Sequence, residues 1–150
     1  MRRTNSDKLP TDHTVLIERP IQMWEKLAWD VDVFGDIQRG YPNERQPICY
    51  AAINVCIAAQ SLHWWVKAEL KRTKRSYDEA SLYQAISGQK MCEAIANTAK
   101  HASFNEKQWA NGSLKIAWEP GDEDVPSGFM LYAHEAQGLR LVHGAFLEVR

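Results

Sequence analysis

The chain has 150 residues, of which 45% are hydrophobic and 25% are charged, and its formal net charge is -1. This length and composition are typical of one globular domain with a hydrophobic core, and they exclude a collagen-like or globally disordered chain. The balanced charge excludes the broad positive field of a dedicated nucleic-acid binder, so any contact with nucleic acid must come from a local basic patch.

The sequence also indicates the cellular compartment of the protein. No run reaches the roughly 20 consecutive apolar residues that a bilayer span requires, and residues 1–10 lack the apolar stretch of a signal peptide. An odd number of cysteines in apolar surroundings indicates reduced thiols. They are Cys49, Cys56 and Cys92. We therefore expect a cytoplasmic protein without a membrane span, in which residues 1–14 form a flexible tail and residues 15–150 form a single domain.

The first two thirds of the chain have helical periods. Pro20 and Pro47 each suit the first turn of a helix, and Ser76 with Glu79 has the spacing of a capping box. Gly88 is expected to break the pattern. Helices are predicted from Pro20 to a stop around Gly35 to Gly40, and at about 47–70, 76–86 and 89–102. The first is expected to bury the stripe Ile21, Trp24, Leu27, Ala28, Val31 and Phe34.

After Asn111 and Gly112 the period changes to alternation between apolar and polar residues. This pattern predicts strands over 114–119, 129–133 and 139–143, with 145–149 as a possible fourth. The expected fold class is therefore α+β, with a predominantly helical bundle of about four helices followed by a small antiparallel β-meander.

The fourth helix carries a polar stripe. Glu93, Asn97, Lys100 and His101 are spaced so that they share one side of a helix. One interpretation is a catalytic site, with His101 as general acid or base, Lys100 as a phosphate contact, Asn97 as a positioning amide and Glu93 as the partner that fixes the tautomer of the histidine. The other interpretation is a solvated helix face with incidental ion pairs.

The run from Ala96 to His101, with Phe104 beyond it, resembles the signature of the HEPN superfamily of helical, RNA-associated domains. Asn97, His101 and Phe104 match that signature, whereas its arginine falls at Ala96. The resemblance implies a helical fold and an ancestry in RNA cleavage, as in toxins and phage-defence proteins of the family. Because lysine does not reproduce the bidentate fork of arginine, Lys100 predicts degenerate or altered activity.

A basic run at the end of the second helix is the other candidate for nucleic-acid binding. It consists of Lys71, Arg72, Lys74 and Arg75 and follows Trp64 and Trp65. Cations beside aromatic rings are typical of surfaces that hold a nucleic-acid strand. The alternative is a helix end whose cations oppose the helix dipole and whose tryptophans belong to the core.

No metal or cofactor is predicted. Cys49, Cys56 and His63 are spaced by seven residues, which is roughly 10.5 Å of helix, so one metal ion cannot reach two of them. The sequence has neither a glycine-rich phosphate loop nor a nucleophile elbow.

Two functions remain open. The first is a HEPN-like protein that binds RNA or cleaves it in a degenerate way. The second is a non-catalytic protein-protein interaction module that associates with itself. A strand over 145–149 would leave a sheet edge uncovered. We therefore predict a homodimer joined through the terminal strands or through the tryptophan-bearing helices.

Overall fold

A computed structural model of the chain describes residues 17–102 and 112–150, so the predicted tail over 1–14 lies outside the described residues. The elements in chain order are α1 (Pro20–Gly40), α2 (Arg45–Arg72), α3 (Glu79–Ala85), α4 (Ser87–His101), β1 (Ser113–Glu119), β2 (Gly128–Glu135), β3 (Gly138–Leu141) and α5 (Val142–Val149). The predicted α+β class is confirmed. The four predicted helices and three predicted strands all form, and a fifth helix follows them.

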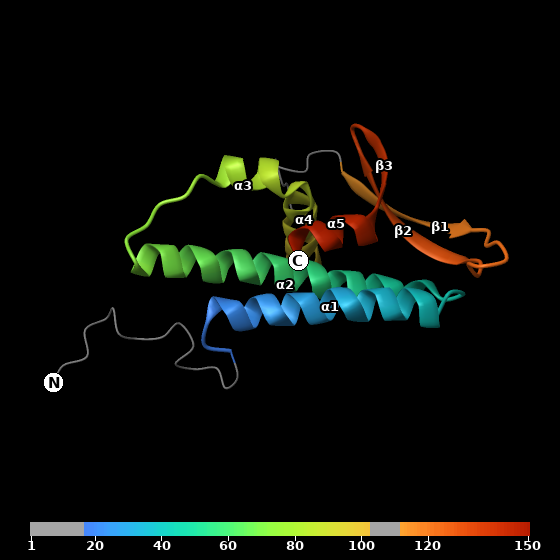
Figure 1. Ribbon diagram of the computed structural model, residues 1–150. Helices are drawn as coiled ribbons and strands as arrows, with labels where there is room; N and C mark the ends of the chain where they lie inside the picture. The colour runs from blue at the N-terminus through green and yellow to red at the C-terminus, as the bar shows by residue number, and fades with distance from the viewer. Residues whose placement is uncertain (1–16, 103–111) are drawn as a thin grey trace.

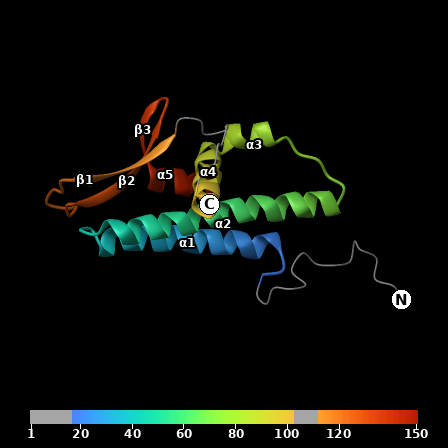
Figure 2. The ribbon, with the colours of Figure 1, turned by 180° about the vertical axis from the view of Figure 1, so that it is seen from behind.

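The two long helices form one layer of the molecule. α1 and α2 run antiparallel and side by side (Figure 1). The other elements pack against this pair, with α4 contacting α2, and α5 and β2 contacting α1. Figure 2 shows the same arrangement from behind. The strands pair in the order β1-β2-β3, and both pairs are antiparallel. The meander is therefore an extension at one end of a helical body.

The buried face of α1 differs in part from the predicted stripe. Leu27, Val31 and Phe34 are fully buried as expected, but Ile21 and Trp24 are 52% and 42% exposed. Met23 takes the place in the core that Trp24 was expected to hold. The indole of Trp24 instead donates a hydrogen bond to the carbonyl of Arg150, 3.1 Å away. The amphipathic pattern located the helix correctly but misplaced the edge of its apolar face.

Helix starts also differ from the prediction. α2 begins at Arg45 rather than at Pro47. The N-cap of α3 is Asp78, whose carboxylate accepts from the amide of Ala80, and not Ser76. Gly88 lies in the first turn of α4 instead of breaking the helix. These are shifts of a few residues, and the order of elements is unchanged.

The run at 145–149 is a helix, so its interpretation as a fourth strand is wrong. Val142, Ala145, Phe146 and Val149 are buried, at the three- and four-residue steps of α5. The ring of Phe146 packs edge to face on Phe34 of α1, with ring centroids 4.9 Å apart. Because this run forms no sheet edge, the edge argument for a homodimer through terminal strands has lost its basis.

The three cysteines are free thiols. Cys56 of α2 and Cys92 of α4 are fully buried and contact each other across the helix crossing. Burial, followed by the contact with Cys92, raises the pKa of Cys56 well above its ordinary value. Cys56 is therefore a neutral thiol within the core.

Over residues 17–102 and 112–150, none of the helices combines the length and the apolar character that crossing a bilayer requires.

Candidate functional site

A buried glutamine joins the last turns of α4 to the middle of α2. Gln60 is 4% exposed. Its amide nitrogen donates to the side-chain oxygen of Asn97 over 2.7 Å, and its carbonyl oxygen accepts from the ammonium of Lys100 over 2.6 Å. Gln60 therefore fixes both side chains at once, one turn before α4 ends.

The positive charge of Lys100 is held by a neutral group. Other described lysines and arginines that form ion pairs have carboxylate partners, such as Lys26 with Asp30 and Arg72 with Glu69. Lys100 is exposed, and so is His101, the last residue of α4. Of the three N–H donors of an ammonium, the bond to Gln60 uses one. The end of α4 thus presents a positioned cation beside an exposed imidazole.

Glu93 is not part of this exposed group. It is 7% exposed, and one of its carboxylate oxygens lies 2.5 Å from Nδ1 of His63. Eight residues of helix separate Glu93 from His101, which is about 12 Å along the axis. The predicted role of Glu93 as the partner that fixes the tautomer of His101 is therefore wrong, and the histidine that it orients is His63.

Two tyrosines complete a buried polar network around this pair. The hydroxyl of Tyr83 donates to the second oxygen of Glu93 over 2.5 Å. The hydroxyl oxygen of Tyr77 lies 2.6 Å from Nε2 of His63. His63, which is 7% exposed, therefore has a carboxylate at one ring nitrogen and a hydroxyl at the other. This order of hydroxyl, imidazole and carboxylate is the arrangement in which a base is oriented by a third group.

The outer edge of the network is ionic. Glu79 accepts from Lys67 over 2.7 Å and from the hydroxyl of Tyr77 over 3.2 Å. The hydrogen bond from Lys67 is the main cause that lowers the pKa of Glu79. Burial, and then the hydrogen bond to Glu79, raises the pKa of Tyr77 to about 12. Tyr77 therefore remains a protonated hydrogen-bond donor at neutral pH.

The predicted nucleic-acid residues lie elsewhere. They occupy the end of α2 and the turn that follows it: Lys71, Arg72, Lys74 and Arg75. All four are exposed, but Arg72 donates two hydrogen bonds to the carboxylate of Glu69. Lys71 stands eleven residues after Gln60 on the same helix, which is about 16 Å along the axis. The basic run and the group around Lys100 are two separate surfaces.

The two tryptophans before the basic run differ from each other. Trp64 is 65% exposed, and the ammonium of Lys67 lies 5.8 Å from its ring centroid. Trp65 is half-buried and packs against the core. The interpretation of both tryptophans as core residues is therefore wrong for Trp64.

The position of the missing signature arginine is also informative. Ala96 is fully buried, whereas Asn97 is half-buried and His101 is exposed. A side chain at position 96 therefore points into the core and not toward the exposed surface that carries His101. Phe104, the third matching residue, lies outside the described residues.

Within the described parts of the chain, no three histidine, cysteine or carboxylate side chains are placed to hold a metal ion together. His63 is engaged with Glu93 and Tyr77, and Cys56 contacts Cys92. The predicted separation of Cys49, Cys56 and His63 along one helix agrees with these partners.

Sequence reasoning missed Gln60, Tyr77 and Tyr83, and it considered His63 as a metal ligand, rejected that role and kept it only as a core residue. A signal was present, because Gln60 and His63 are polar side chains three residues apart, directly after the largely apolar run from Ile48 to Ala59. Buried polar groups need hydrogen-bond partners. Glu93 and Asn97, four residues apart on α4, supply partners at the matching helical period.

Searches against protein-family models, curated proteins and solved structures found no match to this chain. Any inference about function therefore rests on the geometry of the site.

Proposed function

We propose that the chain binds RNA at the end of α4, through the surface formed by Asn97, Lys100 and His101. The observation that carries this proposal is the positioning of Lys100 by the neutral side chain of Gln60, at 2.6 Å. Among the described residues no carboxylate pairs with Lys100, so its ammonium, already held in place, can attract a phosphate. His101 beside it offers a ring that stacks on a base or donates to a phosphate oxygen.

Standard HEPN-like cleavage is not part of the proposal. That chemistry needs the signature arginine beside the histidine, and position 96 is an alanine buried in the core. Lys100 supplies a point charge but not a bidentate fork. The surface is therefore best suited to binding, with His101 as the residue on which any remaining cleavage would depend.

The test is the affinity for a fluorescently labelled single-stranded RNA of about 20 nucleotides, measured by anisotropy at several salt concentrations. Lys100→Ala should weaken binding about three- to tenfold. It should also reduce the slope of log affinity against log salt by about 0.7, the value for one phosphate contact on a single strand. His101→Ala should weaken binding without unfolding the protein, because an exposed histidine contributes little to stability.

Lys26→Ala is the matched control, because it removes the same charge from a lysine that is paired with Asp30 on α1. Its affinity and salt slope should stay close to those of the unchanged chain. Equal losses in Lys26→Ala and Lys100→Ala would contradict the proposed surface, and so would an absence of binding at low salt. A denaturing gel of the same mixtures should show intact RNA.

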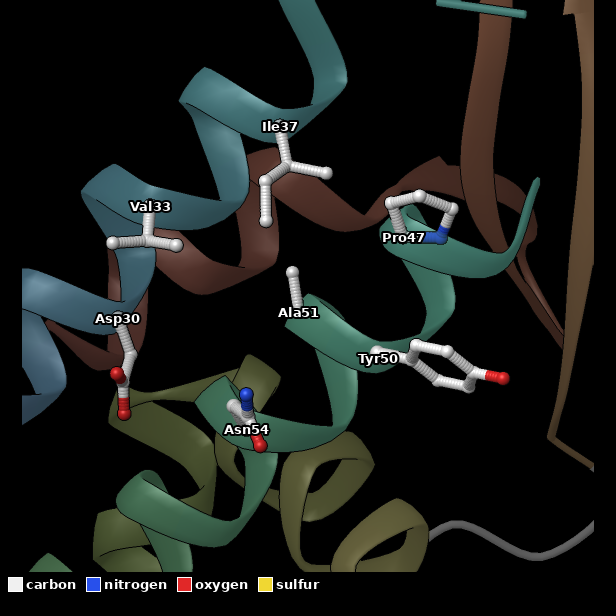
Figure 3. A pocket seen from close by; sticks show the side chains of 7 residues that line it. All are labelled: Asp30, Val33, Ile37, Pro47, Tyr50, Ala51 and Asn54. Atoms are coloured by element: carbon white, nitrogen blue, oxygen red, sulfur yellow. The ribbon is translucent and has the colours of Figure 1, made fainter. Parts of the chain in front are cut away.

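The outer face of α1 and α2 favours self-association as a second function. Trp29, Tyr50 and Trp64 are 70%, 62% and 65% exposed. A shallow pocket of about 300 Å³ opens between the two helices. Val33 and Ile37 of α1 face Pro47 and Ala51 of α2 across it (Figure 3). Tyr50 lines this pocket. Exposed aromatic side chains and apolar depressions are typical of protein interfaces.

This second function places a homodimer interface on the tryptophan-bearing helices. Light scattering at micromolar concentration should give the mass of two chains. Trp29→Glu should reduce it to the mass of one chain, because a buried unpaired carboxylate is costly. A single-chain mass for the unchanged protein would exclude the dimer.

A further inference from the structure

The segment between α2 and α4 is the least buried part of the helical body. None of the residues of α3 is buried. Over residues 76–85, only Tyr77, Leu82 and Tyr83 are even half-buried. In Figure 1 α3 lies above α2 and beside α4. Such a segment has little apolar contact to hold it, so it belongs to the low-stability end of a fold.

The polar contacts of this segment converge on one buried pair. Tyr77 reaches Nε2 of His63 at 2.6 Å, and Tyr83 donates to Glu93 at 2.5 Å. Glu79 lies 3.6 Å from the same His63 nitrogen. Hydrogen bonds to a carboxylate, such as that from Tyr83 to Glu93, are the stronger class, and the side chains of His63 and Glu93 are both buried. The two tyrosine hydroxyls therefore attach this segment to the buried pair of His63 and Glu93.

We propose that residues 76–85 are a cover that Tyr77 and Tyr83 latch onto the His63–Glu93 pair, and that lifting this cover exposes His63 as a carboxylate-oriented base. In the closed state the hydroxyl of Tyr77 occupies Nε2, the ring nitrogen through which His63 would act. In the open state Glu93 still holds Nδ1 of His63, because His63 belongs to α2 and Glu93 to α4, and neither belongs to the cover.

The groups around His63 come from three elements. α4 contributes Glu93, the cover contributes Tyr77 and Glu79, and Lys67 of α2 pairs with Glu79. Opening removes Tyr77 and Glu79 and leaves the histidine with the carboxylate of Glu93. An imidazole with one nitrogen bound to a carboxylate and the other free is the arrangement of a general base.

The test uses diethyl pyrocarbonate, which modifies accessible neutral imidazoles, with the rate at each histidine followed by mass spectrometry of peptides. In the unchanged chain, His63 should react at least about tenfold more slowly than exposed His134. The variant Y77F/Y83F keeps both rings and removes both hydroxyls. It should raise the rate at His63 about tenfold or more, the effect of losing one such hydrogen bond on the closed state.

Two internal controls make the result specific. Tyr132→Phe removes a hydroxyl that donates to Glu119 in the sheet, and it should leave the rate at His63 unchanged. His143, half-buried in α5, reports global unfolding, and its rate should stay constant in all variants. A rate at His63 equal to that at His134 in the unchanged chain would show that the cover does not close. Continued protection of His63 in Y77F/Y83F would show that the tyrosine hydroxyls are not the latch.

Discussion

The two ends of α4 pack in opposite ways. At its N-terminal end, the helix lies so close to α5 that a Cβ built on Gly88 would be 2.7 Å from the carbonyl oxygen of Ala145. From its middle onward, α4 meets α2 and the cover through polar side chains, first Glu93 and then Asn97 and Lys100. One end is fixed by shape and the other by specific hydrogen bonds.

This difference determines how each end responds to substitution. A close backbone contact tolerates a smaller side chain but resists a larger one, since added atoms force the helices apart. A buried polar network resists removal, because the groups left behind lose their partners and cannot regain water. The N-terminal end should therefore be sensitive to added atoms, and the polar C-terminal end to removed ones.

The largest effect is expected at the polar end. Glu93→Ala removes the carboxylate and leaves the imidazole of His63 and the hydroxyl of Tyr83 without their acceptor. Removing one partner of a buried pair should lower the free energy of unfolding by about 3 kcal/mol, as measured by urea denaturation at pH 7. Glu79→Ala removes an exposed carboxylate from the same network and should cost less than about 1 kcal/mol. Equal losses in the two variants would contradict the distinction between buried and exposed parts of the network.

The second largest effect is expected at the N-terminal end of α4. Gly88→Ala places a methyl group against the carbonyl of Ala145, and backbone atoms cannot rotate away. The free energy of unfolding should fall by about 2 kcal/mol. Gly144 is the matched control, because a Cβ there meets nothing within 4 Å and alanine suits a helix better than glycine. A loss in Gly144→Ala as large as that in Gly88→Ala would show that close packing is not the reason.

The sequence predicted most of the fold because long amphipathic helices and alternating strands leave strong periodic patterns. It failed at the C-terminal end, where Leu139 to Val149 is apolar enough to fit either period. Val142, Ala145, Phe146 and Val149 have helical spacing, but the preceding strands favoured a continued meander. Short apolar runs do not separate the two periods, and here the packing of Phe146 against Phe34 selects the helix.

The candidate site was predictable only in part. The spacing of residues 97, 100 and 101 correctly placed a cation and an imidazole near one helix end, but helical spacing cannot say which side chains of a stripe are buried. Glu93 is buried because α2 crosses α4 at His63, and that crossing is a tertiary contact. The cover is invisible in the sequence for the same reason, since Tyr77 and Tyr83 acquire a role only through partners on other helices.

The smallest effect is expected from the hydrogen bonds at the N-terminal end of α4, beside the close packing of Gly88. Glu148 of α5 accepts from the hydroxyl of Ser87 over 3.0 Å and from the amide of Gly88 over 3.3 Å, and it pairs with Arg140 over 2.6 Å. Burial alone would raise the pKa of Glu148, but these hydrogen bonds, chiefly from Arg140 and Ser87, outweigh it and hold the pKa below its ordinary value.

A carboxyl group whose folded-state pKa is lowered stabilises the fold above its ordinary pKa of 4.5, and the contribution disappears as pH falls through the folded-state value. Glu148→Gln should therefore lower the free energy of unfolding at pH 7 by less than about 1 kcal/mol, since the pair is partly exposed. The difference from the unchanged chain should shrink below pH 4.5 and vanish in more acidic solution. Urea denaturation of both chains between pH 7 and pH 2 measures it, and a difference that persists at the acidic end would show that Glu148 acts through packing and not through its charge.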